Sequence, residues 1–140
     1  MLRSIWERIE TIEECYEFML AYAAQGLTND YGSKSGGQVR EYLVRAAAAL
    51  GGLAQACATA VGEENFEQEE RLVQFFAVLD RDARDSLAVI ELVLAQPSIS
   101  SQLIDNLNAS MHLRALLTDM FLLGEVLKTQ QSTAANVASS

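Results

Sequence analysis

Apolar and polar residues alternate with a helical period from the start of the chain. Between Leu2 and Ala23, apolar side chains recur at alternating intervals of three and four residues, with mainly charged residues between them. This heptad pattern is typical of an amphipathic helix whose narrow apolar stripe packs against other helices. Gly26 follows and suits a left-handed C-cap, so we predict a helix over 2–25. Its stripe consists of Leu2, Ile5, Ile9, Ile12, Tyr16, Met19 and Ala23.

Three further segments have the same period and predict helices over 36–61, 66–95 and 99–128. The helix predicted over 36–61 also carries many small residues, including the adjacent pair Gly51 and Gly52 in its interior. Each glycine costs a helix roughly 1 kcal/mol relative to alanine, so the pair has either a packing role or a role as a hinge or ligand contact. Its seam consists of Val39, Leu43, Ala46, Leu50, Leu53, Cys57 and Ala60.

The connections between these segments contain capping signals. Ser35, followed three residues later by Gln38, has the spacing of a capping box at the start of the second helix. Pro97 ends the third helix, and Ser98 or Ser100 can cap the fourth. The second and third connections are short, which places consecutive helices side by side and antiparallel.

These elements predict an all-α protein, an antiparallel up-down-up-down four-helix bundle within one domain over 1–128. The alternative is a bundle that extends or exchanges a helix with another copy of the chain. Hydrophobic residues make up 50% of the 140 residues, which favours an ordered core over disorder. Only 129–140 lack a periodic apolar pattern, and we expect them to form a flexible, disordered polar tail.

The net charge of −9 argues against nucleic acid and anionic membrane as partners, because both attract basic surfaces. A basic protein is the better electrostatic match. The N-terminal residues show no secretory signal, and the most membrane-like stretch, 46–61, is interrupted by Gln55 and Thr59. We therefore expect a cytoplasmic protein without a membrane-spanning segment.

The residues that most often carry chemistry do not form a recognisable constellation. In the antiparallel arrangement Cys15 and Cys57 differ in height by about 16 Å, too far for a disulfide, and both should be reduced thiols. The single histidine, His112, lacks a glutamate three residues before it, and the predicted seams carry no carboxylate. We therefore expect no metal, no cofactor and no catalytic site.

Three groups of residues are candidates for binding. The loop before the second helix and the first turn of that helix contain positively charged and hydroxyl side chains that suit an anion or a partner: Tyr31, Ser33, Lys34, Ser35 and Arg40. The alternative is that this loop is only a flexible connector. A stripe of acidic side chains on the first helix suits a basic partner or serves only as a solvated face: Glu10, Glu13, Glu14 and Glu17.

The third group consists of large apolar residues beyond what the seams require, predicted at one end of the bundle: Trp6, Phe75, Phe121 and Leu122. Such a group is typical of an interface, and it predicts a homo-oligomer, with a dimer favoured. The alternative is a monomer in which the same side chains thicken the core.

Bundles serve many functions, so the fold alone does not identify one. The first hypothesis is a non-enzymatic accessory, adaptor or chaperone-like protein that acts through protein contacts and self-association. The alternative is a bundle that binds or senses a small anionic metabolite, with Tyr31, Lys34 and Arg40 as contacts. An enzyme is the least favoured reading, and it would depend on His112 or Cys15.

Overall fold

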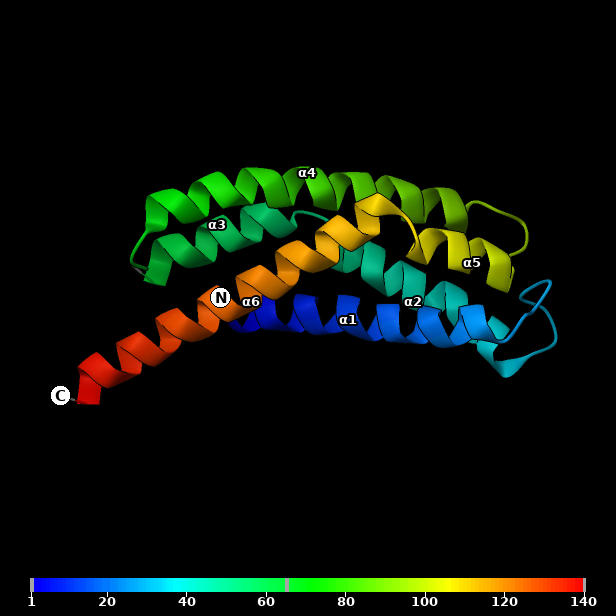
Figure 1. Cartoon of the computed structure of the whole chain (residues 1–140), viewed down its shortest axis with the longest axis horizontal. Coiled ribbons are helices and arrows are strands. Elements are labelled where there is room, and N and C mark those ends of the chain that lie inside the picture. The colour runs from blue at the N-terminus through cyan, green and yellow to red at the C-terminus, as the bar shows by residue number, and fades with distance from the viewer. Residues whose placement is uncertain (1, 65, 140) are drawn as a thin grey trace.

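The computed structural model describes the backbone of residues 2–64 and 66–139, and side chains in these ranges as far as Thr129. Helices are the only regular secondary structure in this part of the chain, which contains no strand, and this confirms the all-α prediction. Six helices are present where four were predicted (Figure 1). They are α1 (Leu2–Ala24), α2 (Lys34–Leu50), α3 (Leu53–Glu64), α4 (Glu69–Leu94), α5 (Ser101–Asn108) and α6 (Met111–Ser139).

The predicted helix over 36–61 is divided into α2 and α3, which meet at a bend of 47°. Gly52 lies at the bend with φ +68°, a left-handed conformation that glycine adopts without the steric cost of a Cβ atom. Arg8 of α1 donates hydrogen bonds to the carbonyl oxygens of Ala49, at 3.1 Å, and Gly51, at 2.8 Å. The prediction of one continuous helix was therefore wrong, because the glycine pair ends α2 and Arg8 satisfies its terminal carbonyls.

The apolar phase of the predicted helix nevertheless continues across this bend. All seven seam positions predicted from the sequence are buried: Val39, Leu43, Ala46, Leu50, Leu53, Cys57 and Ala60. Among the described residues no single helix is both long enough and apolar enough to cross a membrane, and α2 and α3 meet those two criteria only when taken together.

The N-cap residue of α2 differs from the predicted one. Ser33, not Ser35, is the N-cap, and its hydroxyl oxygen accepts a hydrogen bond from the Gly36 amide at 3.0 Å. The loop backbone also packs closely against the helix at this point, since a Cβ atom added to Gly36 would lie 2.5 Å from the carbonyl oxygen of Asp30. The absence of a side chain at Gly36 therefore allows the loop to close over the first turn of α2.

The predicted helix over 99–128 is also divided, because α5 ends at Asn108 and α6 begins at Met111. Ser100 is the N-cap of α5, as one of the two predicted alternatives, and its side chain accepts a hydrogen bond from the Leu103 amide at 3.0 Å. The short α5 packs on α1, and α6 extends from the middle of the molecule to the end opposite the loop between α1 and α2 (Figure 1).

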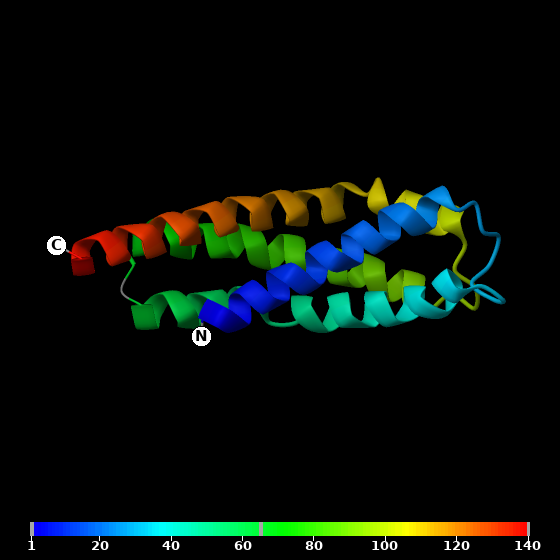
Figure 2. The ribbon, with the colours of Figure 1, turned by 90° about the horizontal axis from the view of Figure 1, so that it is seen from below.

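The backbone of α6 remains helical to Ser139 instead of ending at Lys128, so most of the predicted polar tail is helix. Residues 129–139 contain no glycine or proline, and each added residue extends an existing helix by one hydrogen bond. Ser140 lies outside the described residues. The C-terminal part of α6 projects past the turn between α3 and α4 in both views (Figures 1 and 2).

The core forms where α1 packs on α2 and α5, and where α4 packs on α2, α3 and α6. Because α1 has neighbours on two sides, its buried surface is wider than a single seam. Cys15 and Tyr22 are fully buried, whereas Tyr16 and Ala23 from the predicted stripe are only half-buried.

Hydrogen bonds fix the end of α1 to the start of α5. The buried Tyr22 hydroxyl donates to the carbonyl oxygen of Ile99 at 2.6 Å. The Ser101 hydroxyl donates to the carbonyl oxygen of Tyr22 at 2.6 Å and accepts from the Leu27 amide at 2.9 Å. These contacts join segments more than 70 residues apart in the chain.

Candidate functional site

Arg40, which the sequence offered as an anion contact, connects two loops of the protein. Its Nε atom bonds the Asp30 carboxylate at 3.0 Å, and its two terminal nitrogens donate to the carbonyl oxygens of Leu94, at 3.0 Å, and Gln96, at 2.8 Å. The other Asp30 oxygen accepts from the Ile99 amide at 2.8 Å. Burial acts to raise the pKa of Asp30, but these hydrogen bonds outweigh it and hold the pKa below its ordinary value.

The other residues predicted in this loop lie nearby, and most are bonded within the protein. The exposed Tyr31 donates from its hydroxyl to the carbonyl oxygen of Pro97 at 2.8 Å. Ser33 caps α2, and Ser35 accepts a hydrogen bond from the Gln25 side chain at 3.0 Å. Lys34 is exposed at the first position of α2. The loop therefore closes one end of the molecule, and Arg40 directs its donors at protein oxygens.

The large apolar residues predicted to share one end of the bundle lie on opposite sides of α6. Trp6 and Phe121 line a groove between α1 and α6, whereas Phe75 and Leu122 line a second groove between α4 and α6. We call these the α1/α6 groove and the α4/α6 groove. Phe121 and Leu122 are 57% and 55% exposed, so the outer surface of α6 is apolar between the two grooves.

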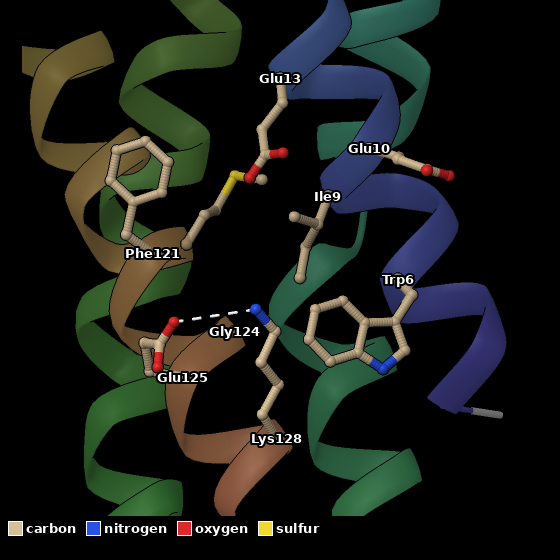
Figure 3. Close-up of a pocket in the computed structure, with 9 residues that line it drawn as sticks. Trp6, Ile9, Glu10, Glu13, Phe121, Gly124, Glu125 and Lys128 are labelled. Atoms are coloured by element: carbon tan, nitrogen blue, oxygen red, sulfur yellow. Dashed lines mark ion pairs between the residues drawn. The ribbon is translucent and has the colours of Figure 1, made fainter.

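The α1/α6 groove has a volume of about 520 Å³ (Figure 3). Ile9 and Met120, both buried, form its base, while the half-buried Trp6 and the exposed Phe121 stand on opposite helices. The indole ring lies over Gly124, where an added Cβ atom would make an ordinary van der Waals contact with the ring of Trp6 at 3.6 Å. The groove thus presents two aromatic side chains to solvent above an apolar base.

The rim of this groove is acidic. Glu10 and Glu13 contribute carboxylates from α1, and Glu125 contributes a third from α6. Among the described residues of its lining, Lys128 is the only one with a cationic side chain, and its Nζ lies 3.8 Å from a Glu125 oxygen (Figure 3). The remaining members of the predicted stripe, Glu14 and Glu17, are exposed on α1 and do not line the groove. The groove therefore contains two of the four glutamates of the stripe.

The α4/α6 groove is smaller and much less charged. It has a volume of about 260 Å³, and among the described residues that line it Glu67, Gln68 and Arg71 are the polar ones. Its apolar lining consists of Leu72, Phe75, Leu122, Leu123 and Val126. The exposed Leu122 and Val126 lie four residues apart and form a ridge beside the groove.

Cys15 and Cys57 are free and buried, and burial raises the pKa of each thiol to about 12. A thiol with such a pKa is almost entirely uncharged near neutral pH and is a poor nucleophile. The His112 side chain is 56% exposed, with its Nδ1 atom 3.9 Å from Asp85. Within the described residues no group of three or more His, Cys, Asp or Glu side chains is placed to hold a metal ion.

An acidic pair between α4 and α6, formed by the half-buried Asp82 and the buried Asp119, was not anticipated. Asp119 is only 7% exposed, and its Oδ2 atom is among the buried polar atoms without a hydrogen-bond partner in the described part of the chain. Burial, together with a hydrogen bond to Asp82 and the charge of that residue, raises the pKa of Asp119 to about 7. Two carboxyl groups in contact retain a proton more readily than either does alone.

No family model, no curated protein and no solved structure matches this chain. Function is therefore inferred from the residues of the two grooves beside α6 and from their chemistry.

Proposed function

We propose that this protein is a non-enzymatic accessory or adaptor protein, chaperone-like in its mode of action, that works through protein contacts and self-associates. The observation that carries the proposal is the apolar outer surface of α6, where Leu122 is 55% and Phe121 is 57% exposed. Clustered exposed apolar side chains between two grooves are typical of an interaction surface rather than of scattered surface residues.

The α4/α6 groove is the part of this surface that we assign to self-association. An interface between two identical subunits related by a two-fold axis uses the same patch on both. The ridge of Leu122 and Val126 lies directly beside a groove lined by Leu72 and Phe75. One copy can therefore place its ridge in the groove of the other, and both contacts form at once.

The proposed dimer is built from subunits in which the six helices act as four antiparallel arms. In this arrangement α2 with α3, and α5 with α6, each form one bent arm of an up-down-up-down bundle. Two free, buried thiols, Cys15 and Cys57, support a reducing compartment such as the cytoplasm.

Sedimentation velocity of the full chain at micromolar concentration tests self-association. We expect the wild-type protein to sediment as a dimer and the Leu122→Asp variant to sediment as a monomer with unchanged helical circular dichroism. Val44→Asp is the matched control, because Val44 on α2 is also 55% exposed but lies away from both grooves. A monomeric wild-type protein, or equal dissociation by the two variants, would contradict the proposal.

The alternative of an anionic-metabolite binder has less support. Three nitrogens of Arg40 already donate to protein oxygens, and the Tyr31 hydroxyl donates to Pro97. The α4/α6 groove is mainly apolar, and the α1/α6 groove has more acidic than basic side chains, so the grooves suit apolar or cationic groups better than anions.

A further inference from the structure

The α1/α6 groove combines aromatic, apolar and acidic groups, and we propose that it binds a basic amphipathic helix of a partner protein. This inference rests on the proposed function in one respect, namely that the protein works through protein contacts. It does not require self-association, which uses the α4/α6 groove. The partner it names is a helix with apolar residues on one face and lysine or arginine beside them.

The apolar part of the groove accounts for the apolar face of the partner. Ile9 and Met120 close the base, so an inserted side chain would lose its contact with water. Phe121 is 57% exposed, so a partner could bury much of this side chain. Aromatic side chains are among the strongest contributors to the binding energy of protein interfaces. The half-buried Trp6 stands on the opposite helix.

The charges of the groove account for the basic residues of the partner. Glu10, Glu13 and Glu125 supply three carboxylates against the single ammonium of Lys128. Glu10 and Glu13 are three residues apart on α1, a spacing at which like charges repel and destabilise a helix slightly. A cation between them would relieve this repulsion, and arginine or lysine can do so while its methylene groups lie on the aromatic rings.

The dimensions favour a helix over a small cation. From Trp6 to Glu13 the α1 wall spans seven residues, or about 10 Å, which is about two turns of a helix laid alongside it. Two residues four apart on the same face of the partner helix could then contact Trp6 and Glu10 at the same time, as in helix-in-groove recognition. The acidic stripe continues along α1 with Glu14 and Glu17, which gives a longer partner further complementary charge.

The single tryptophan of the chain provides a direct measurement, because Trp6 lies in the groove. The probe is a helical peptide of about 15 residues with leucine on one face and lysine and arginine on both flanks. A second peptide carries glutamate in place of each basic residue. We expect the basic peptide to shift Trp6 emission in a saturable manner, with binding that weakens as salt is raised, and the acidic peptide to produce no shift.

Variants locate the binding on the surface. Glu10→Gln combined with Glu13→Gln should weaken binding roughly fivefold, as expected for the loss of two ion pairs at the rim of the groove. The matched control combines Glu41→Gln with Glu91→Gln, which removes the same charge at exposed positions outside the groove and should change the affinity less than twofold.

Three outcomes would overturn the inference. The first is no binding of the basic peptide, and the second is equal weakening of binding by the two double variants. The third is binding of a small alkylguanidinium as tight as that of the peptide, which would make the groove a small-molecule site. The titration is repeated with Leu122→Asp, so that a failure of self-association is distinguished from a failure of this groove.

Discussion

Replacing Asp119 with asparagine should stabilise the protein above pH 7 and have its smallest effect near pH 4. Asp119 is 7% exposed on α6, and burial together with Asp82 raises its pKa from 3.8 to about 7. In the unfolded chain the carboxyl group has its ordinary pKa, so between these two values the folded protein binds the extra proton. Stability therefore falls as the pH rises from about 4 to about 7, and then levels off.

The size of the effect follows from the shift. One pKa unit corresponds to about 1.4 kcal/mol, so the change from 3.8 to about 7 has an upper bound of about 4 kcal/mol. Asp82 is only half-buried, and water screens its repulsion of Asp119, so we expect about 2 kcal/mol at pH 8. Asparagine has nearly the same shape and carries no charge, and its amide can donate to the Asp82 carboxylate.

Urea denaturation followed by circular dichroism at pH 4, 6 and 8 measures this difference in the free energy of unfolding. Asp105→Asn is the control, because Asp105 is exposed on α5 and its replacement removes the same charge. We expect the gain from Asp119→Asn to increase with pH and to exceed that of the control by about 2 kcal/mol at pH 8. A gain independent of pH, or one no larger than the control, would refute the assignment of a buried acidic pair.

Three further substitutions test the close contacts and hydrogen bonds at the loop end of the molecule. Gly36→Ala places a Cβ atom 2.5 Å from a backbone oxygen of the preceding loop and should lower the free energy of unfolding by about 2 kcal/mol. The added Cβ atom of Gly37→Ala meets no atom within 4 Å, and this substitution should raise the free energy of unfolding by about 1 kcal/mol. Changes of the same sign for the two variants in urea denaturation would contradict the close contact between the loop and Gly36. Tyr22→Phe removes the buried 2.6 Å hydrogen bond to Ile99 and should cost about 1–2 kcal/mol, measured in the same way. A cost below about 0.5 kcal/mol would show that this bond adds little to stability.

The phase of the apolar residues could be predicted from the sequence, whereas the helix ends could not. Every seam position from Val39 to Ala60 is buried, because burial depends on a period that continues through both α2 and α3. Because the apolar period is uninterrupted from α2 to α3, it gives no indication of the break between the two helices. The break depends on the left-handed backbone of Gly52 and on capping by Arg8, which lies 43 residues from Gly51 in the sequence.

For the candidate site, the sequence predicted the position of residues along the bundle axis but not the face of the helix on which each side chain lies. Antiparallel pairing placed Trp6 level with Phe121, and the two residues do share a groove. Leu122 faces the other groove because consecutive helical residues point about 100° apart. Arg40 was a reasonable anion contact by residue type, but its carbonyl partners lie 54 and 56 residues away and have no signature in the sequence.

The hydrogen bonds that join residues 22–40 to residues 94–101 make the two ends of the molecule mechanically unequal. Arg40, Tyr22 and Ser101 tie backbone oxygens of distant segments together at one end. Both grooves lie toward the other end, where packing between apolar side chains predominates. Amide hydrogens near the tied end should exchange only through global unfolding, whereas those of α3 and α6 should also exchange through local opening. A partner seated beside α6 would then slow exchange at its own end of the molecule and leave the tied end unchanged.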